Sequence, residues 1–252
     1  ALLRSHPLHT TASQPHFQTA AAERIELVRR RNRLVRVVEA AQRERVRDGE
    51  QTARAVSAVL TRLGYIHEGS LKHKAAGLRE MVAPSGIVIS EMYHEGMLED
   101  LAPAELAEVL SWFACDVDRR RYNSLSLPAN LRTLRTLTSM AFGRVRALEE
   151  RQRVRLAQGP SNWFYGVALA WCAGASIQSI SPSIEIGEGD IVSILNKTVD
   201  LLDQFRGLLV RYGDYDMLAV TAKARQLLNH GMVAMLRSDG VSRPQQLTIP
   251  TF

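Results

Sequence analysis

Apolar side chains recur at helical spacing along most of this chain and predict a succession of helices. The first helix is expected at residues 20–47. Its apolar face consists of Leu27, Leu34, Val38 and Ala41. The Asp48-Gly49 pair is expected to end this helix. A second helix is predicted at residues 51–63, and Gly64 follows it where a left-handed C-terminal turn would form.

The same spacing continues through the rest of the chain. A short extended turn is expected at residues 65–71. Helices are then predicted at about residues 71–82, 85–95, 103–113, 130–158, 163–173, 176–180, 190–209 and 215–236. Pro103 suits an early helical position, and Asp190 suits an N-cap. Strands do not alternate with helices, so the predicted fold class is all-α, a multi-helix bundle with a long Arg-rich N-terminal helix.

These patterns divide the chain into four predicted parts. Residues 1–19 show no period and form a flexible lead-in. Residues 20–50 form an Arg-rich helical arm, residues 51–237 a helical bundle, and residues 238–252 a polar tail. The chain begins with Ala1 rather than methionine, which suggests a processed product or a fragment.

Composition excludes several classes of protein. Hydrophobic residues make up 46% of the 252 residues, which is enough for a sizeable core and too many for a disordered chain. Cys115 and Cys172 lie in apolar surroundings and predict reduced thiols in an intracellular protein. No Cys/His spacing suits zinc, so no metal site is expected. The uncharged stretch at residues 156–184 holds too many polar residues and prolines for a membrane helix, so no membrane association is expected.

Charge is distributed unevenly, and the net charge of +6 conceals this. Residues 20–48 carry nine basic and five acidic side chains, residues 50–118 carry five and eleven, and residues 119–155 carry ten and two. Such asymmetry predicts a polyanionic partner, an internal charge match between segments, or both. All but four of the basic residues are arginines. This bias suits nucleic acid, although a GC-rich genome would produce it as well.

No catalytic site is predicted. The chain has no phosphate-binding loop of the form G-x-x-x-x-G-K-[ST], and the Gly-rich turn at residues 187–190 carries two carboxylates that would repel phosphate. No serine lies in a nucleophile motif. No cofactor is therefore expected to bind this chain itself.

The candidate binding residues are basic. Arginines spaced along the predicted helix of the 119–155 segment suit a phosphate backbone, and those from Arg24 to Arg47 would extend the same surface. The arginines predicted to contact phosphates are Arg144, Arg146, Arg151, Arg153 and Arg155. The alternative is a solvated face or an internal partner for the acidic 50–118 segment. A helix–turn–helix at residues 171–195 has few basic residues on its second helix, so a DNA-binding regulator is not expected.

Four short motifs occur in order along the chain. They are V-L-T-R-L-G-Y-I at residues 59–66, E-M-Y-H-E-G-M-L-E-D-L-A-P-A-E-L-A at 91–107, W-C-A-G-A-S at 171–176, and E-G-D-I-V with D-L-L-D-Q at 188–192 and 200–204. Together they resemble the DSHCT domain, the C-terminal helical domain of Ski-like DExH-box RNA helicases, over roughly residues 52–236. The last two stretches look nearer to the bacterial HelY and plastid branch than to the exosome branch.

The resemblance implies a helical bundle that packs on helicase motor domains and contacts single-stranded RNA. ATP and Mg²⁺ would act in motor domains placed before Ala1, and the compartment would be the plastid or the cytoplasm. Exosome-branch members often carry arginines on the helix that corresponds to residues 191–205. This chain has Ser193, Asn196, Lys197 and Asp203 there, so Lys197 is the one RNA-binding position carried over on that helix.

Two hypotheses follow. In the first, the chain is the RNA-contacting accessory domain of an ATP-dependent DExH-box RNA helicase. In the second, it is a protein–protein docking module of a larger RNA-processing assembly and binds no RNA of its own. The long, thinly apolar first helix favours the second hypothesis.

Overall fold

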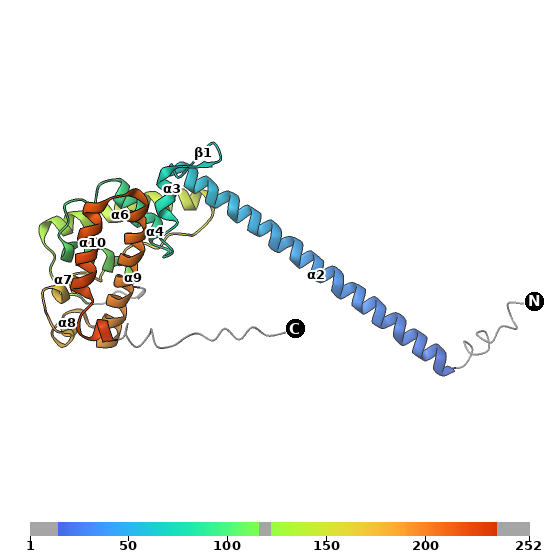
Figure 1. The fold of residues 1–252 in the computed structure, drawn as a ribbon. Coiled ribbons are helices and arrows are strands. Elements are labelled where there is room, and N and C mark those ends of the chain that lie inside the picture. The colour runs from blue at the N-terminus through green and yellow to red at the C-terminus, as the bar shows by residue number, and fades with distance from the viewer. Residues whose placement is uncertain (1–14, 116–121, 236–252) are drawn as a thin grey trace, which may run out of the picture. The chain divides into compact units, whose positions relative to one another are not determined.

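The computed structural model describes residues 15–115 and 122–235 of the chain (Figure 1). The predicted tail at 238–252 and most of the predicted lead-in lie outside these residues. The chain separates between Arg54 and Ala55 into two units. The first unit contains most of helix α2 (Pro15–Arg62), and the second is a helical bundle.

One helix, α2 (Pro15–Arg62), spans the region where two were predicted. The expected stop at Asp48-Gly49 is therefore wrong. A glycine inside a helix costs only about 1 kcal/mol relative to alanine. The residues that flank Gly49 are largely good helix formers, such as Arg, Gln, Glu and Ala, and they outweigh that cost. Helix α2 also begins within the segment that was predicted to be a lead-in.

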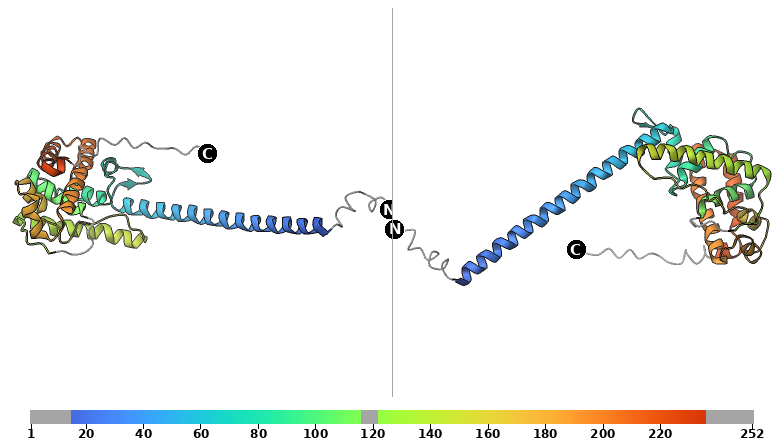
Figure 2. Two further views of the ribbon diagram at one scale, coloured as in Figure 1. Left: turned by 90° about the horizontal axis from the view of Figure 1, so that it is seen from below. Right: turned by 180° about the vertical axis from the view of Figure 1, so that it is seen from behind.

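The bundle is formed by helices and one small hairpin, which confirms the all-α fold class. The helices are α3 (His73–Leu78), α4 (Gly86–His94), α5 (Pro103–Ala114), α6 (Ala129–Gln152), α7 (Val167–Cys172), α8 (Ile177–Ile184), α9 (Glu188–Tyr212) and α10 (Tyr215–Leu228). Figures 1 and 2 show α9 and α10 side by side, and the two helices are in contact.

The extended turn predicted after Gly64 is an antiparallel hairpin of strands β1 (Ile66–His67) and β2 (Ser70–Leu71). Its two loop residues both have positive φ, 48° at Glu68 and 76° at Gly69. Two left-handed residues in a two-residue loop are typical of a type I′ turn, whose twist matches that of the flanking strands.

Helix α5 is the centre of the bundle. It packs against α7, α9 and α10, and every residue from Leu106 to Ala114 is buried. A helix that is apolar nearly all round can only be stable inside a core. Pro103 lies in its first turn, as predicted, where a missing N–H is harmless.

Glu108 is the charged residue of this buried helix stretch, and it has no exposed surface. Its carboxylate accepts hydrogen bonds from Trp112 Nε1 at 2.8 Å, from Gly166 N at 2.5 Å and from Leu169 N at 3.0 Å. The last two amides lie at the N-terminus of α7, so Glu108 caps that helix from α5. Burial raises the pKa of the Glu108 carboxyl, while these donors and the charge of Arg135 oppose the rise.

Arg135 of α6 completes this buried cluster. Its guanidinium carbon lies 5.2 Å from the ring centroid of Trp112 and 4.9 Å from that of Tyr165. It also donates to the carbonyl oxygen of Ser161. A planar guanidinium placed against two aromatic rings is a favourable cation–π arrangement. Arg135 therefore ties α6 to α5 and to the segment before α7.

Several helix ends differ from the predictions. Helix α6 ends at Gln152 rather than 158, because Arg153 adopts a left-handed conformation with φ of 56°. Gly187, not Asp190, is the N-cap of α9, and Asp190 lies in the first turn, where an acidic group suits the helix dipole. Helix α10 ends at Leu228, earlier than predicted, and residues 231–235 form a separate helical turn.

Among the described residues, no helix is long and apolar enough to span a membrane. Nor do residues 15–115 and 122–235 contain three or more His, Cys, Asp or Glu side chains grouped so as to hold a metal ion.

Replacement of the buried carboxylate provides a test of this core. Glu108→Ala should lower the free energy of unfolding by about 3 to 5 kcal/mol, because it leaves α7 uncapped and Arg135 without its nearby negative charge. Urea denaturation monitored by circular dichroism measures this change. Glu99→Ala removes an exposed carboxylate and should change the stability by less than about 1 kcal/mol. Equal effects of the two substitutions would contradict the role assigned to Glu108.

Candidate nucleic-acid interface

Helix α6 carries Arg144, Arg146 and Arg151, three of the five arginines predicted to contact RNA on the 119–155 segment, and Arg153 and Arg155 follow its end. The buried face of the helix decides which of these arginines are available. That face consists of Leu131, Leu134, Thr138, Ala141, Val145 and Glu149. These positions are three or four residues apart, so they form one stripe along the helix. The arginines between them lie beside the stripe or opposite it, and their surroundings differ.

The basic 119–155 segment is not a uniform surface. Arg135 is part of the core, and Arg132 donates through Nη1 to the carbonyl oxygen of Leu127 at 3.0 Å. Arg119, Arg120 and Arg121 lie outside the described residues. Sequence reasoning counted all of these with the candidate phosphate contacts and missed the core role of Arg135. The signal that could have indicated it is Glu108, a carboxylate in an apolar stretch that needs a partner.

Arg144 and Arg146 are held by carboxylates of the chain itself. Arg144 forms an ion pair with both carboxylate oxygens of Glu95, at the end of α4. Arg146 Nη1 lies 3.2 Å from Glu149 Oε2, and Arg146 Nε lies 3.4 Å from Glu150 Oε1. The pair with Glu95 joins the basic segment to the acidic one, so part of the charge asymmetry is an internal match.

The end of α6 is shaped by Glu149, whose side chain is completely buried. Its carboxylate accepts hydrogen bonds from the amides of Leu156 at 3.1 Å and Ala157 at 2.7 Å. The amide of Val154 also bonds to the Glu149 carbonyl oxygen at 3.0 Å. The chain therefore turns back tightly after the helix, and this turn is fixed from within.

Arg151, Arg153 and Arg155 are exposed around this turn. Within the described part of the chain they form no ion pair. We name these three residues the basic corner. Positive charges near a helix C-terminus also interact favourably with the helix dipole, and this interaction is one reason for arginines at the end of α6. The basic corner nevertheless presents three guanidinium groups on a backbone of defined shape.

Lys197 lies on the exposed side of α9. It lines a pocket of about 200 Å³ together with Asp200, Gln204 and Gln158. Gln158 follows Arg155 by three residues, and its backbone N–H donates to the carbonyl oxygen of Pro84 at 3.1 Å. The segment that leaves the basic corner therefore leads to the pocket of Lys197.

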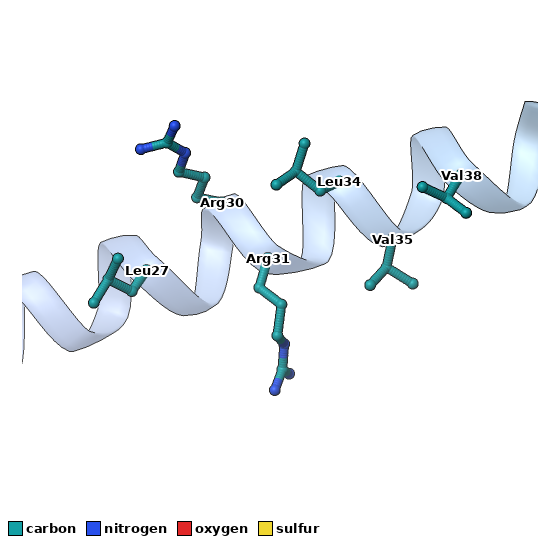
Figure 3. Close-up of a pocket in the computed structure, with 6 residues that line it drawn as sticks. All are labelled: Leu27, Arg30, Arg31, Leu34, Val35 and Val38. Carbon is teal, nitrogen blue, oxygen red and sulfur yellow. The ribbon is translucent and has the colours of Figure 1, made fainter. Parts of the chain in front are cut away.

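Helix α2 offers a second kind of surface. Leu27 and Leu34 are 64% and 58% exposed, and together with Val35 and Val38 they line a shallow groove of about 610 Å³ along the helix. Figure 3 shows Arg30 and Arg31 extending from this row in opposite directions. We name the exposed aliphatic surface formed by Leu27, Leu34, Val35 and Val38 the α2 face. Large aliphatic side chains exposed together are typical of an interaction surface.

The comparison with known proteins agrees with the arrangement of the bundle. Residues 68–235 match the family model of the DSHCT (NUC185) domain, which is more than half of the chain. The chain belongs to the DSHCT family. Its sequence is also 26% identical over 172 residues to a probable helicase HelY of Mycobacterium leprae (strain TN). This similarity covers 63% of the chain but only 18% of that relative. The chain is therefore a helicase-associated domain.

The DSHCT motifs seen in the sequence are largely core features. Tyr65 of the first motif donates its hydroxyl proton to Glu91 of the second at 2.5 Å. Trp171 of the third donates to the Leu228 carbonyl oxygen at 3.0 Å and stacks on His230 with ring centroids 4.3 Å apart. The motifs thus identify the DSHCT bundle by its packing, and they do not by themselves indicate where a ligand binds.

Replacement of the buried carboxylate of Glu149 tests whether it fixes the turn that carries the basic corner. Glu149→Ala should increase the exchange rate of the Leu156 and Ala157 amides by about tenfold or more, because both lose their acceptor. Hydrogen exchange followed by NMR measures this directly. Glu150→Ala, which removes an exposed neighbour, should leave both rates nearly unchanged. Unchanged protection in Glu149→Ala would show that the turn does not depend on this carboxylate.

Proposed function

We propose that this chain is the C-terminal accessory helical domain of an ATP-dependent DExH-box RNA helicase and that it contacts single-stranded RNA through the basic corner. Membership of the DSHCT family and similarity to a helicase support the first part. The second part rests on one observation: the guanidinium groups of Arg151, Arg153 and Arg155 are exposed on a turn fixed by Glu149 and form no ion pair with any residue that the structure describes.

This proposal narrows the set of contacts expected from sequence. Arg144 and Arg146 already have carboxylate partners, and a phosphate would have to displace them. Among the described residues no carboxylate pairs with the basic corner, so its guanidinium groups can bind a phosphate oxygen without displacing one. Lys197 stays in the proposal as an additional contact because it is exposed on α9.

The motor activity belongs to another part of the helicase in this proposal. ATP and Mg²⁺ would be bound by motor domains on which the bundle packs, because the sequence of this chain holds no phosphate-binding loop. The bundle would help to hold RNA while the motor moves along it. The proposal places the protein inside the cell, in the plastid or the cytoplasm.

The basic corner can be tested by RNA titration. The triple variant Arg151→Ala, Arg153→Ala, Arg155→Ala should bind fluorescein-labelled oligouridylate about tenfold to a hundredfold more weakly at about 0.1 M salt. Its plot of log affinity against log salt should be shallower by about 2, since each phosphate contact to a single strand contributes about 0.7 to the slope. Fluorescence anisotropy at several salt concentrations gives both quantities.

Two controls separate this site from general charge effects. The triple variant Arg62→Ala, Arg206→Ala, Lys223→Ala removes the same charge from other exposed positions and should keep the wild-type salt slope. The double variant Arg144→Ala, Arg146→Ala should also keep it, because these groups are already paired. If all three variants behave alike, RNA contact at the basic corner is excluded.

A second function, docking onto a protein, is favoured by the α2 face. Residues 23–38 carry six arginines and two glutamates around the exposed aliphatic row. Nucleic acid leaves such aliphatic side chains in water, whereas a protein groove buries them. A second copy of α2 would bring arginine against arginine. The partner that fits is therefore an acidic protein surface with an apolar groove.

Site-specific cross-linking distinguishes this docking function from RNA binding. A photoreactive amino acid at Leu34 should form protein cross-links that survive nuclease treatment, and mass spectrometry should map them to an acidic segment with aliphatic residues. The same group at Arg33, outside the aliphatic row, is the matched control and should give few cross-links. Cross-links from Leu34 only to RNA, or to a second copy of α2, would refute docking through this face.

A further inference from the structure

A second groove lies wholly within the bundle, between the hairpin, α3 and the C-terminal end of α9. Its volume is about 610 Å³. The residues that line it are Leu60, Tyr65, Leu71, Lys72, His73, Ala75, Ala76, Leu78, Arg79 and Arg211. We name it the hairpin groove. It shares no residue with the basic corner or with the α2 face, so neither proposed function accounts for it.

The floor of the hairpin groove is aliphatic. Leu60, Leu71 and Leu78 supply most of it, and Leu71 at the end of the hairpin is 75% exposed. Of the rings in the lining, Tyr65 is fully buried and its hydroxyl bonds to Ser90 and Glu91. The imidazole of His73 is exposed and lies against the Tyr212 ring, with the two ring centroids 5.3 Å apart. The leucine floor itself suits branched aliphatic side chains better than stacked nucleic-acid bases.

The rim of the hairpin groove is cationic, and no carboxylate of a described residue lines it. Arg211 is neutralised by Glu80, whose Oε1 lies 2.8 Å from its Nε. Lys72 and Arg79 are exposed and form no ion pair with any residue that the structure describes. An aliphatic floor beneath two available positive charges is complementary to a ligand with leucine-like side chains and carboxylates.

The groove is also preformed, because its walls are tied together from inside. The Tyr212 hydroxyl of α9 donates to the Lys74 carbonyl oxygen of α3 at 2.7 Å. Gly77 of α3 lies against the Tyr212 ring so closely that a Cβ there would overlap it. The Lys74 ammonium bonds to the Leu63 carbonyl oxygen at 2.9 Å and to Glu91 at 2.7 Å. A ligand therefore does not have to organise the site as it binds.

We propose that the hairpin groove binds an acidic peptide segment of a partner protein, in which closely spaced leucine, isoleucine or valine residues are flanked by aspartate or glutamate. The aliphatic side chains fill the floor next to Leu71 and Leu78. The flanking carboxylates meet Lys72 and Arg79. Phosphate groups of RNA would satisfy the rim alone and would leave the aliphatic floor in water.

The experiment titrates the full chain with a fluorescein-labelled dodecapeptide of sequence EDLEDLLEDIEG. Binding in the micromolar range is expected, and it should weaken several-fold as salt rises from about 0.05 M to about 0.3 M, since screening reduces the charge attraction. An acidic peptide with serine in place of its aliphatic residues, and a neutral one with glutamine and asparagine in place of its acidic residues, should each bind at least about tenfold more weakly.

Paired variants of the chain place this binding in the hairpin groove. Leu71→Ser should weaken it by about tenfold, whereas Val82→Ser, at a residue that is 84% exposed outside the groove, should not. Arg79→Glu should weaken it by a similar factor, whereas Arg206→Glu, which makes the same charge change on α9, should have little effect. Leu71 and Arg79 line the groove, whereas Val82 and Arg206 do not. All four residues are exposed, so the variants should remain folded, which thermal unfolding verifies.

Three outcomes would overturn the proposal. These are absence of peptide binding below millimolar concentration, equal effects of each variant and its control, and displacement of the bound peptide by oligouridylate in a manner that depends on Leu71 and Arg79. The last outcome would assign the groove to RNA. None of these results bears on the basic corner, which is tested with separate variants.

Discussion

A carboxylate without any exposed surface lies at the centre of the bundle, and the surrounding helices are arranged so as to satisfy it. Glu108 belongs to α5, which is buried nearly all round, and a charge in such a place is tolerated only with several donors and a nearby positive group. The N-terminus of α7 supplies two amides and Trp112 a third donor. The positive group is Arg135 of α6. The positions of α6 and α7 relative to α5 thus follow from one buried charge.

Two further buried carboxylates organise their surroundings in the same way. Glu149 holds the turn after α6, and Glu91 accepts from Tyr65 and pairs with Lys74 where the hairpin meets α3. In each case an acidic group organises backbone or basic groups from the inside. Several charged residues that the sequence suggests are on the surface therefore lie in the interior or in ion pairs within the chain. Arg151 at the end of α6, with Arg153 and Arg155 just beyond it, forms no ion pair among the described residues, whereas Arg135, Arg144 and Arg146 have partners within the bundle.

This use of charge explains which features sequence could predict. Helices such as α5 and α9 were predicted because apolar periodicity is a local signal, and their burial confirms it. The end of α6 was not predicted, because it depends on the hydrogen bond from the Leu156 amide to the Glu149 carboxylate. The continuity of α2 through Gly49 was not predicted either, because it depends on a glycine that the surrounding helix tolerates. The pairing of Arg144 with Glu95 joins residues 49 positions apart, and no local pattern reveals such a contact.

The hairpin groove and the basic corner are both cationic, and the apolar area beneath the charge is what distinguishes them. A phosphate backbone gains from positive charge alone, since its own surface is charged and hydrated. An acidic peptide gains from charge and from burial of its aliphatic side chains, so it selects a site that offers both. The basic corner offers only the first, and the hairpin groove offers both. Because the two proposed sites share no residue, RNA at the basic corner and a protein segment in the hairpin groove would not compete for the same side chains.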